Sequence, residues 1–199
     1  MNDNAAPTYA VGRRAKCICL IGANGTGKST LAVTLMNRQP RGLILLPSFD
    51  NWAVQFAPCA CARKSDFDFV GIHHRIMDSG NIAAFDAIYK HFTDGLLVCD
   101  DPLTYTPKNL EDHPLKKILG RRRQMRCDVL FMAHSFMRLP PMFFSYVTDY
   151  VVYNTDLGDV DKRKTDLGQH YAKIRQMVQN ANRAAAQNPH YCEIYKTGL

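Results

Sequence analysis

The sequence predicts an α/β fold in which a mostly parallel central sheet carries helices on both faces. Short apolar runs of strand length alternate with amphipathic stretches of helix length, which is typical of a parallel sheet covered by helices. Hydrophobic residues make up 46% and charged residues 22% of the chain, as in ordinary globular proteins. A length of 199 residues predicts one domain that is large enough to bury its own core.

The expected elements follow one another in a regular order. Apolar runs predict strands over Lys16–Ile21, Leu43–Leu46, Phe67–Ile72, Leu96–Asp100, Asp128–Ala133 and Asp149–Tyr153. Amphipathic stretches predict helices over Gly27–Arg38, Asn81–Phe92, Lys108–Arg122 and from about Val160 to Gln187. The last helix is polar, with a thin apolar stripe at Ile174, Met177 and Val178, and is therefore expected on the surface. Irregular structure is expected over the proline-containing segments Pro47–Ser65 and Asp101–Pro107.

The sequence predicts a short N-terminal arm followed by a single domain. Residues 1–15 are expected to form a flexible N-terminal arm, and residues 16–199 a single domain that includes the C-terminal helix. The arm lacks the apolar segment of a secretory signal peptide. The longest apolar runs fall well short of the ~18 residues that a membrane-spanning helix needs. We therefore expect a cytoplasmic protein with no membrane span.

The seven cysteines are expected to be reduced and mostly buried. Their number is odd, and Cys17, Cys19 and Cys99 lie inside strand-like apolar runs. A zinc site at Cys59 and Cys61, with the histidine pair at 73–74, is the lesser alternative. A Cys-x-Cys pair does not have the usual zinc spacing, and adjacent histidines would point to opposite faces of a strand.

A glycine-rich loop follows the first expected strand. Residues 22–29 fit the phosphate-binding pattern G-x-x-x-x-G-K-[ST] in full. Its glycines let backbone N–H groups converge on phosphate oxygens, and the helix beginning near Gly27 adds its positive dipole end. Lys28 is expected to bridge the β- and γ-phosphates of ATP, and the Ser29 hydroxyl to bind Mg²⁺. The expected ATP-binding residues are Gly22, Ala23, Asn24, Gly25, Thr26, Gly27, Lys28, Ser29 and Thr30.

Two carboxylates follow the apolar run that begins at Leu96. Asp100 and Asp101 are expected at the carboxyl edge of a buried strand, where open α/β sheets bind ligands. Asp100 would hold Mg²⁺, and Asp101 would orient or deprotonate the attacking water. The plainer alternative is a strand that simply ends in a polar turn. For Asp101 this alternative has more weight, because Pro102 restricts its backbone.

An arginine-rich turn and a strand with a polar tip come next. Arginines cluster in residues 121–126, and His134 and Ser135 follow the strand expected over 128–133. His134 or Ser135 could sense the γ-phosphate or its attacking water. An arginine of the turn could reach a neighbouring subunit's nucleotide and stabilise charge in the transition state. A solvated basic turn and an ordinary packed histidine are the alternatives.

Taken in order, these elements resemble the FtsK/HerA superfamily of DNA-pumping ATPases. They look most like the genome-packaging ATPases of tailless double-jelly-roll and poxvirus-type viruses. The resemblance covers roughly residues 16–154 and includes the pair Leu139-Pro140 after the polar strand tip. It implies a RecA-like P-loop NTPase core. By its spacing from the strand tip, Arg123 resembles the family's trans-acting arginine, and His134 stands where the family usually has glutamine.

The resemblance also implies an activity and partners. It implies hydrolysis of ATP with Mg²⁺, coupled to the movement of double-stranded DNA without sequence specificity. The family works as a ring of copies, usually hexameric, which docks on capsid or vertex proteins in the host cytoplasm or at a packaging vertex. The implied catalytic set is Lys28, Asp100, Asp101, Arg123 and His134, with Ser29 and Asp100 on the metal.

The charge of the chain agrees with a polyanionic partner. Lys and Arg number 25 and Asp and Glu number 18, which gives a net charge of +7. Such an excess suits a channel that follows DNA phosphates without reading bases. Candidate DNA-facing residues are Arg63, Lys64, Lys108, Lys116, Lys117, Lys162, Arg163 and Lys164. Ordinary solvated helix faces are the alternative for most of them.

Three other functions remain open on the sequence alone. A small nucleotide or metabolite kinase has a similar length, but it does not need this order of carboxylate pair and sensor strand. A filamentous-phage-type assembly ATPase shares the core but normally carries a transmembrane segment. A nucleotide-regulated binding module would be favoured if Asp101 does not act as a base.

Overall fold

The structure is a computed structural model, and it describes residues 14–48 and 52–198. Its strands are β1 (Cys17–Ile21), β2 (Arg41–Leu46), β3 (Ala57–Pro58), β4 (Gly71–Ile76), β5 (Gly95–Asp100), β6 (Cys127–Ala133), β7 (Asp149–Val152) and β8 (Glu193–Lys196). Its helices are α1 (Lys28–Met36), α2 (Ile82–His91), α3 (Pro114–Arg121), α4 (Leu157–Lys162), α5 (Lys164–Leu167) and α6 (Tyr171–Ala184). The predicted N-terminal arm lies almost wholly outside the described residues.

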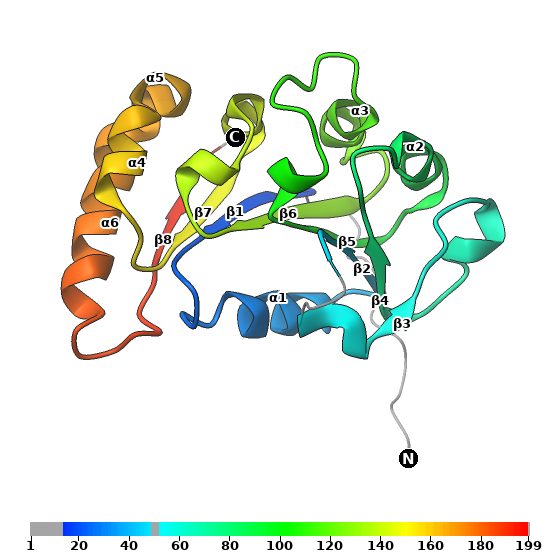
Figure 1. Cartoon of the computed structure of the whole chain (residues 1–199), viewed down its shortest axis with the longest axis horizontal. Coiled ribbons are helices and arrows are strands. Elements are labelled where there is room, and N and C mark those ends of the chain that lie inside the picture. Colours follow the sequence, from blue (N-terminus) through cyan, green and yellow to red (C-terminus); the bar gives the residue numbers. More distant parts are fainter. Residues whose placement is uncertain (1–13, 49–51, 199) are drawn as a thin grey trace.

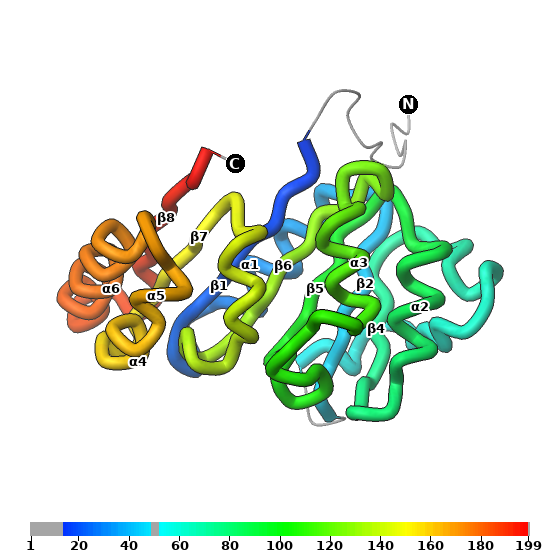
Figure 2. The backbone as a smooth tube through the Cα atoms, turned by 90° about the horizontal axis from the view of Figure 1, so that it is seen from above, coloured from blue at the N-terminus to red at the C-terminus, as the bar shows by residue number. Residues whose placement is uncertain are grey.

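The strands form one sheet in the order β3-β4-β2-β5-β6-β1-β7-β8. Each pairing among β1 to β7 is parallel, whereas β8 runs antiparallel to β7. Helix α1 packs on one face, and α2, α3 and the group α4 to α6 pack on the other (Figures 1 and 2). The predicted α/β fold, with a mostly parallel sheet and helices on both faces, is therefore confirmed.

The core is built on the three central strands β1, β5 and β6, which are buried along their whole length. Burial on both faces explains why these strands are continuous apolar runs in the sequence. On the face of α1, Ala32 and Met36 pack with Leu20 and neighbouring strand residues. Six of the seven cysteines are buried. These buried strands are therefore rigid supports for the motif side chains that follow their carboxyl ends.

Two predicted boundaries are wrong for local reasons. The strand expected from Phe67 begins only at Gly71, because the segment Lys64–Phe67 forms a short 3-10 helix instead. The Asp66 carboxylate accepts backbone N–H bonds at the start of that helix, which stabilises the turn. The helix expected from Lys108 begins only at Pro114, where the His113 side chain accepts the backbone N–H of Leu115 as an N-cap.

The long C-terminal helix expected over 160–187 is also wrong as one element. It is divided into α4, α5 and α6, and the chain turns at Gly168, which has a φ of 51°. The apolar stripe was placed correctly, since Ile174, Met177 and Val178 of α6 are fully buried. After α6 the chain returns to the sheet as β8, a strand that the sequence pattern does not predict.

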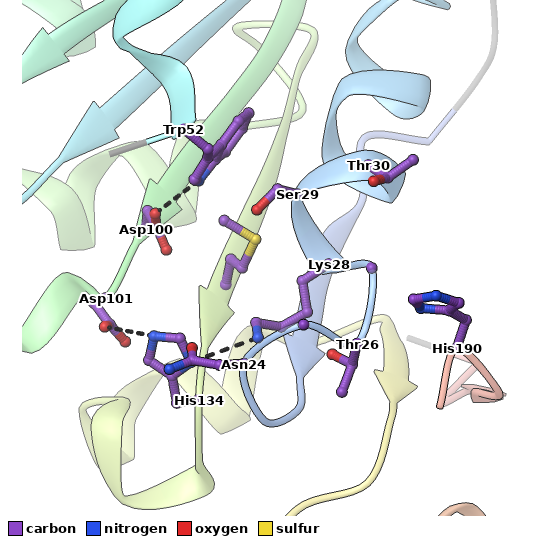
Figure 3. Close-up of a pocket in the computed structure, with 13 residues that line it drawn as sticks. Asn24, Thr26, Lys28, Ser29, Thr30, Trp52, Asp100, Asp101, His134 and His190 are labelled. Carbon is purple, nitrogen blue, oxygen red and sulfur yellow. Dashed lines mark hydrogen bonds and ion pairs between the residues drawn. The ribbon is translucent and has the colours of Figure 1, made fainter. Parts of the chain in front are cut away.

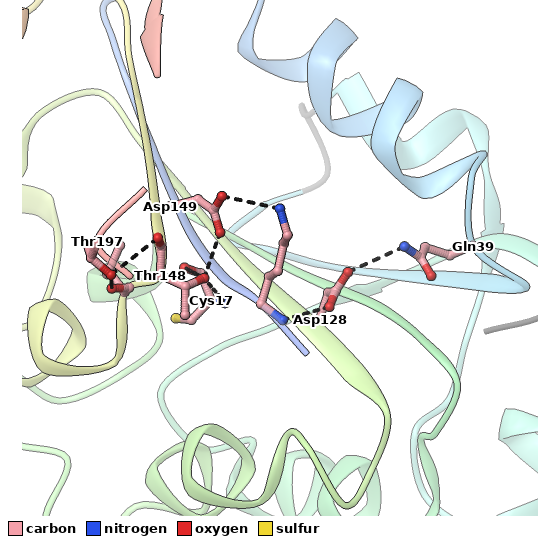
Figure 4. Close-up of polar contacts among 8 residues, drawn as sticks. Cys17, Gln39, Asp128, Thr148, Asp149 and Thr197 are labelled. Carbon is pink, nitrogen blue, oxygen red and sulfur yellow. Dashed lines mark hydrogen bonds and ion pairs between the residues drawn. The ribbon is translucent and has the colours of Figure 1, made fainter. Parts of the chain in front are cut away.

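The amino-terminal edge of the sheet is held by a polar cluster (Figure 4). The Asp128 carboxylate accepts the backbone N–H of Lys16 at 2.8 Å and the Gln39 side-chain amide at 3.4 Å. The Asp149 carboxylate pairs with the Lys16 ammonium at 3.2 Å and accepts the Thr148 hydroxyl at 2.7 Å. These contacts fix the starts of β1, β6 and β7 relative to one another and to the end of α1.

Two observations concern the membrane span and the zinc site that were considered from the sequence. Among residues 14–48 and 52–198, no helix has the length and apolar character needed to cross a bilayer. The sulfur atoms of Cys59 and Cys61 lie 3.2 Å apart, and the His74 ring bonds the Phe56 carbonyl oxygen. The described part of the chain contains no group of three or more His, Cys, Asp or Glu side chains placed to hold a metal ion.

Candidate functional site

A cavity of about 420 Å³ lies at the carboxyl edge of the central strands. Its size is in the usual range for small-molecule sites. The loop after β1, the end of β5 and the tip of β6 all open into it (Figure 3). Its lining residues are Asn24, Gly25, Thr26, Gly27, Lys28, Ser29, Thr30, Trp52, Asp100, Asp101, Met132, His134 and His190.

The loop between β1 and α1 has the backbone that its glycines predict. Gly25 and Gly27 have φ values of 76° and 97°, in the region that residues with a Cβ rarely adopt. Gly22 is required for a different reason, because a Cβ there would lie 2.6 Å from Cβ of Tyr153. Gly27 is the N-cap of α1, so the free N–H groups of the first helical turn face the cavity. This backbone can bind an anion.

Lys28 crosses the loop and is only 7% exposed. Its ammonium donates to the carbonyl oxygens of Gly22 at 2.7 Å and Ala23 at 2.8 Å. Burial lowers the pKa of Lys28, and the nearby carboxylates of Asp100 and Asp101 oppose that shift. The lysine therefore stands as a desolvated cation in the middle of the cavity, where it can bind phosphate oxygens strongly.

The two aspartates at the end of β5 have different surroundings. Asp100 is 8% exposed, and its Oδ2 accepts the indole N–H of Trp52 at 3.0 Å. Asp101 follows it with a φ of 42°, a left-handed conformation that costs energy in a residue with a Cβ. The Oδ1 atom of Asp101 is buried and has no hydrogen-bond partner among the described residues. Oδ1 could therefore accept a hydrogen bond from a water molecule only after the side chain turns it toward the cavity.

His134, at the tip of β6, connects Lys28 to Asp101 (Figure 3). Its Nδ1 lies 3.5 Å from the Lys28 ammonium, and its Nε2 lies 3.3 Å from Oδ2 of Asp101. Because an ammonium only donates, Nδ1 accepts, and the ring proton is then on Nε2 and points to the carboxylate. Ser135, the other sequence candidate for this position, is half-buried and is not among the residues that line the cavity.

Two cavity residues are not indicated by any sequence motif. Trp52 stands beside Asp100, and His190 stands at the opposite end of the loop, near Thr26 and Thr30 (Figure 3). Trp52 is the single tryptophan of the chain, but its position after β2 carries no pattern that predicts a contact with Asp100. His190 lies in the irregular segment between α6 and β8, so its approach depends on a strand pairing that the sequence did not predict.

Comparison with solved structures identifies the fold. The genome packaging NTPase B204 from Sulfolobus turreted icosahedral virus 2, in complex with AMPPCP, matches with a TM-score of 0.67 and 12% identity over 92% of this chain and 93% of that chain. Its complex with ATP-gammaS matches with a TM-score of 0.66 and 12% identity over 92% and 93%. The chain has the P-loop NTPase fold.

A further structure with this fold matches almost as well. B204, the DNA-packaging ATPase from Sulfolobus turreted icosahedral virus, has a TM-score of 0.63 and 12% identity over 93% of this chain and 94% of that chain. No protein-family model matches the sequence, and neither does any curated protein.

Within this P-loop NTPase fold, Arg123 is not brought to the cavity of its own chain. It is exposed in the turn before β6, at the amino-terminal edge of the sheet, whereas His134 follows the other end of the same strand. A strand of this length separates them by roughly 20 Å. Its neighbours have structural contacts: Arg122 is buried and bonds the Leu119 carbonyl oxygen, and Arg126 pairs with Asp94.

The side chains at the cavity fit a magnesium ion that is bound together with a nucleotide. Ser29 and Asp100 supply a hydroxyl and a carboxylate, the hard oxygen ligands that Mg²⁺ prefers. The described residues hold no cage of three or more metal-binding side chains. The remaining ligands would have to come from phosphates and water, which is the usual arrangement for Mg²⁺ in nucleotide sites.

Proposed function

We propose that the chain hydrolyses ATP, moves double-stranded DNA, and works as a genome-packaging motor subunit of the FtsK/HerA type. The observation that carries the hydrolytic part is the series of contacts from Lys28 through His134 to Asp101 beside a phosphate-binding loop. The packaging part is supported by the likeness in fold to B204 over 92% of the chain and by the net charge of +7.

In this proposal the loop and Lys28 bind the triphosphate. The backbone N–H groups at the start of α1 hold the β-phosphate, and Lys28 exchanges its bonds to the Gly22 and Ala23 carbonyl oxygens for bonds to β- and γ-phosphate oxygens. Ser29 and Asp100 would hold Mg²⁺, which supplies positive charge that offsets the charge developing on the phosphates.

Asp101 and His134 act on the attacking water. The Asp101 side chain turns so that its unpartnered Oδ1 faces the cavity, accepts a hydrogen bond from the water and orients it toward the γ-phosphate. His134 donates from Nε2 to the other carboxylate oxygen and so fixes the direction of the carboxylate. When Lys28 moves to the phosphates, Nδ1 of His134 is released, and the ring can then respond to the presence of the γ-phosphate.

Arg123 is proposed to act on the nucleotide of a neighbouring copy. It is exposed and lies at the edge of the sheet opposite the cavity, so it cannot serve its own site without a large rearrangement. A ring of copies, hexameric by analogy with the family, would supply it in trans and would leave capsid or vertex proteins to dock on another face.

The DNA-facing residues are proposed from the exposed basic side chains. Lys64, Lys108 and Lys117 are exposed, and Lys108 lies in the segment between β5 and α3. Arg163, which the sequence offers as a DNA-facing residue, is left out of this proposal, because its guanidinium donates to the carbonyl oxygens of Phe136 and Leu139. Exposed lysines are suited to phosphate contacts that do not read sequence.

ATP turnover with and without long double-stranded DNA tests the proposal. We expect DNA of any sequence to stimulate phosphate release, with a steep loss of stimulation as salt rises. Turnover that requires a small phosphoryl acceptor would replace the translocase by a kinase. Nucleotide binding with no turnover under either condition would favour a binding module.

Mixing of two inactive variants tests the arginine. Arg123→Ala subunits keep the cavity and Asp101→Asn subunits keep the arginine, so a mixture is expected to recover part of the wild-type turnover. Arg183→Ala, an exposed arginine on α6, is the matched control and should be active alone. Assemblies of normal size that stay inactive in the mixture would contradict the assignment of Arg123.

A further inference from the structure

His190 reaches the phosphate-binding loop from the C-terminal part of the chain. It lines the cavity at the end away from Asp101 and His134 (Figure 3). A Cβ atom at Gly27 would lie 3.4 Å from Nδ1 of His190, so the imidazole is in contact distance of the first turn of α1. No sequence motif indicates that this part of the chain contributes to the site.

The antiparallel direction of β8 is what places His190 there. Glu193, the first residue of β8, pairs with Val152, the last residue of β7, so the chain before Glu193 lies at the carboxyl edge of the sheet. Cys192 packs against the apolar cluster that contains Tyr153. Burial, followed by the neighbouring Cys192 side chain, raises the pKa of Tyr153 to about 12. The backbone N–H of His190 also bonds the side-chain oxygen of Asn188 at 3.0 Å, which holds the turn.

The direction of a bound nucleotide follows from the positions of the other cavity residues. The groups that act on a terminal phosphate, Asp101 and His134, lie at one end, and Lys28 lies between them and the loop. A triphosphate that presents its γ-phosphate to Asp101 therefore extends its nucleoside toward the other end. There the cavity is lined by Thr30 and the ring of His190.

We propose that His190 binds the nucleoside half of the substrate through contact of its ring with the base and ribose. This assignment rests on the proposed function, because it takes a nucleoside triphosphate as the substrate. An imidazole ring can stack on a base or hydrogen-bond a ribose hydroxyl, and neither contact involves the phosphates. The C-terminal segment then has a function in the site besides extending the sheet.

Binding of two probes to His190→Ala tests the assignment. The dissociation constants of ATP and of inorganic tripolyphosphate, each with Mg²⁺, are measured by calorimetry for the wild type, for His190→Ala and for the control His91→Ala at the end of α2. We expect His190→Ala to weaken ATP binding about fivefold or more, as for the loss of a base–aromatic contact. Tripolyphosphate binding should be unchanged, and His91→Ala should match the wild type for both probes.

The other outcomes separate this assignment from the proposed function. Equal weakening of both probes would mean that His190 contacts phosphate, and no weakening would mean that it contacts neither part; each result overturns the assignment while ATP binding stands. A wild-type protein that binds neither probe would overturn the proposed function itself, and the His190 assignment with it. Because His190 is exposed in a turn, thermal unfolding of the variant is expected to match the wild type.

Discussion

Asp101→Asn is the substitution that isolates the chemical step. Asparagine has the size of aspartate and also tolerates a left-handed backbone, so the φ of 42° at this position can be kept. Its amide oxygen can still accept from Nε2 of His134, but an NH₂ group then replaces the unpartnered Oδ1 and cannot accept from a water. Loss of a general base typically costs about 10²–10⁴ in rate, which corresponds to about 3–5 kcal/mol in the activation free energy.

The assay compares phosphate release with ATP binding. We expect kcat of Asp101→Asn to fall by about 10²–10⁴, while the dissociation constant of ATP stays close to that of the wild type, because the loop and Lys28 are untouched. Lys28→Ala should lose both turnover and binding. Asp94→Asn is the matched control: Asp94 also has a left-handed φ, of 56°, but it pairs with Arg126 at the other edge of the sheet. If Asp101→Asn keeps more than about a tenth of wild-type turnover while Asp94→Asn is normal, the base assignment is refuted.

Three further predictions concern the rest of the site and the core. His134→Ala should lower kcat about 10-fold to 100-fold, because its hydrogen bond to the Asp101 carboxylate is lost. His134→Gln should keep more turnover than His134→Ala. Equal turnover of the two variants would contradict this prediction. The fluorescence of Trp52, the single tryptophan, should change when ATP and Mg²⁺ bind beside its contact with Asp100. If calorimetry shows that ATP binds while the fluorescence spectrum stays unchanged, that result would count against the contact. Gly95→Ala should destabilise the fold by about 1–3 kcal/mol in urea unfolding, since its Cβ would lie 2.5 Å from the Arg41 carbonyl oxygen. Gly120→Ala should not destabilise it, because among the described residues the added Cβ would meet no atom within 4 Å apart from its chain neighbours and the backbone of its own helix.

The parts of the site that the sequence predicts are those whose residues belong to a contiguous motif or directly follow a recognisable strand. The loop from Gly22 to Ser29 is a contiguous motif. Gly25 and Gly27 have the positive φ that its turns require, and Gly22 leaves room for Tyr153. Asp100 and His134 follow strands that are buried on both faces, so continuous apolar runs mark where those strands end. The carboxyl edge of a parallel sheet then brings these ends together without further information.

The parts that the sequence does not predict depend on distant pairing. His190 enters the cavity only because β8 pairs with β7, and β8 is a short edge strand with alternating burial and no strong apolar run. The contact between Trp52 and Asp100 joins residues 48 positions apart in the chain. The division of the C-terminal helix depends on the backbone conformations of Arg163, between α4 and α5, and Gly168, after α5, which a helical periodicity spanning both sides does not reveal.

The two ends of β6 have a consequence for symmetry. The cavity lies at one end of this strand and Arg123 lies before the other. If Arg123 serves a neighbour in a ring of more than two copies, each copy presents its cavity to one neighbour and its arginine to the other. The contact must then be heterologous, with the front of one copy against the back of the next. Such a contact closes only when the rotation between copies divides a full turn evenly, and otherwise continues as a helical filament. The tilt at this one contact, rather than its strength, would set how many nucleotides the assembly holds.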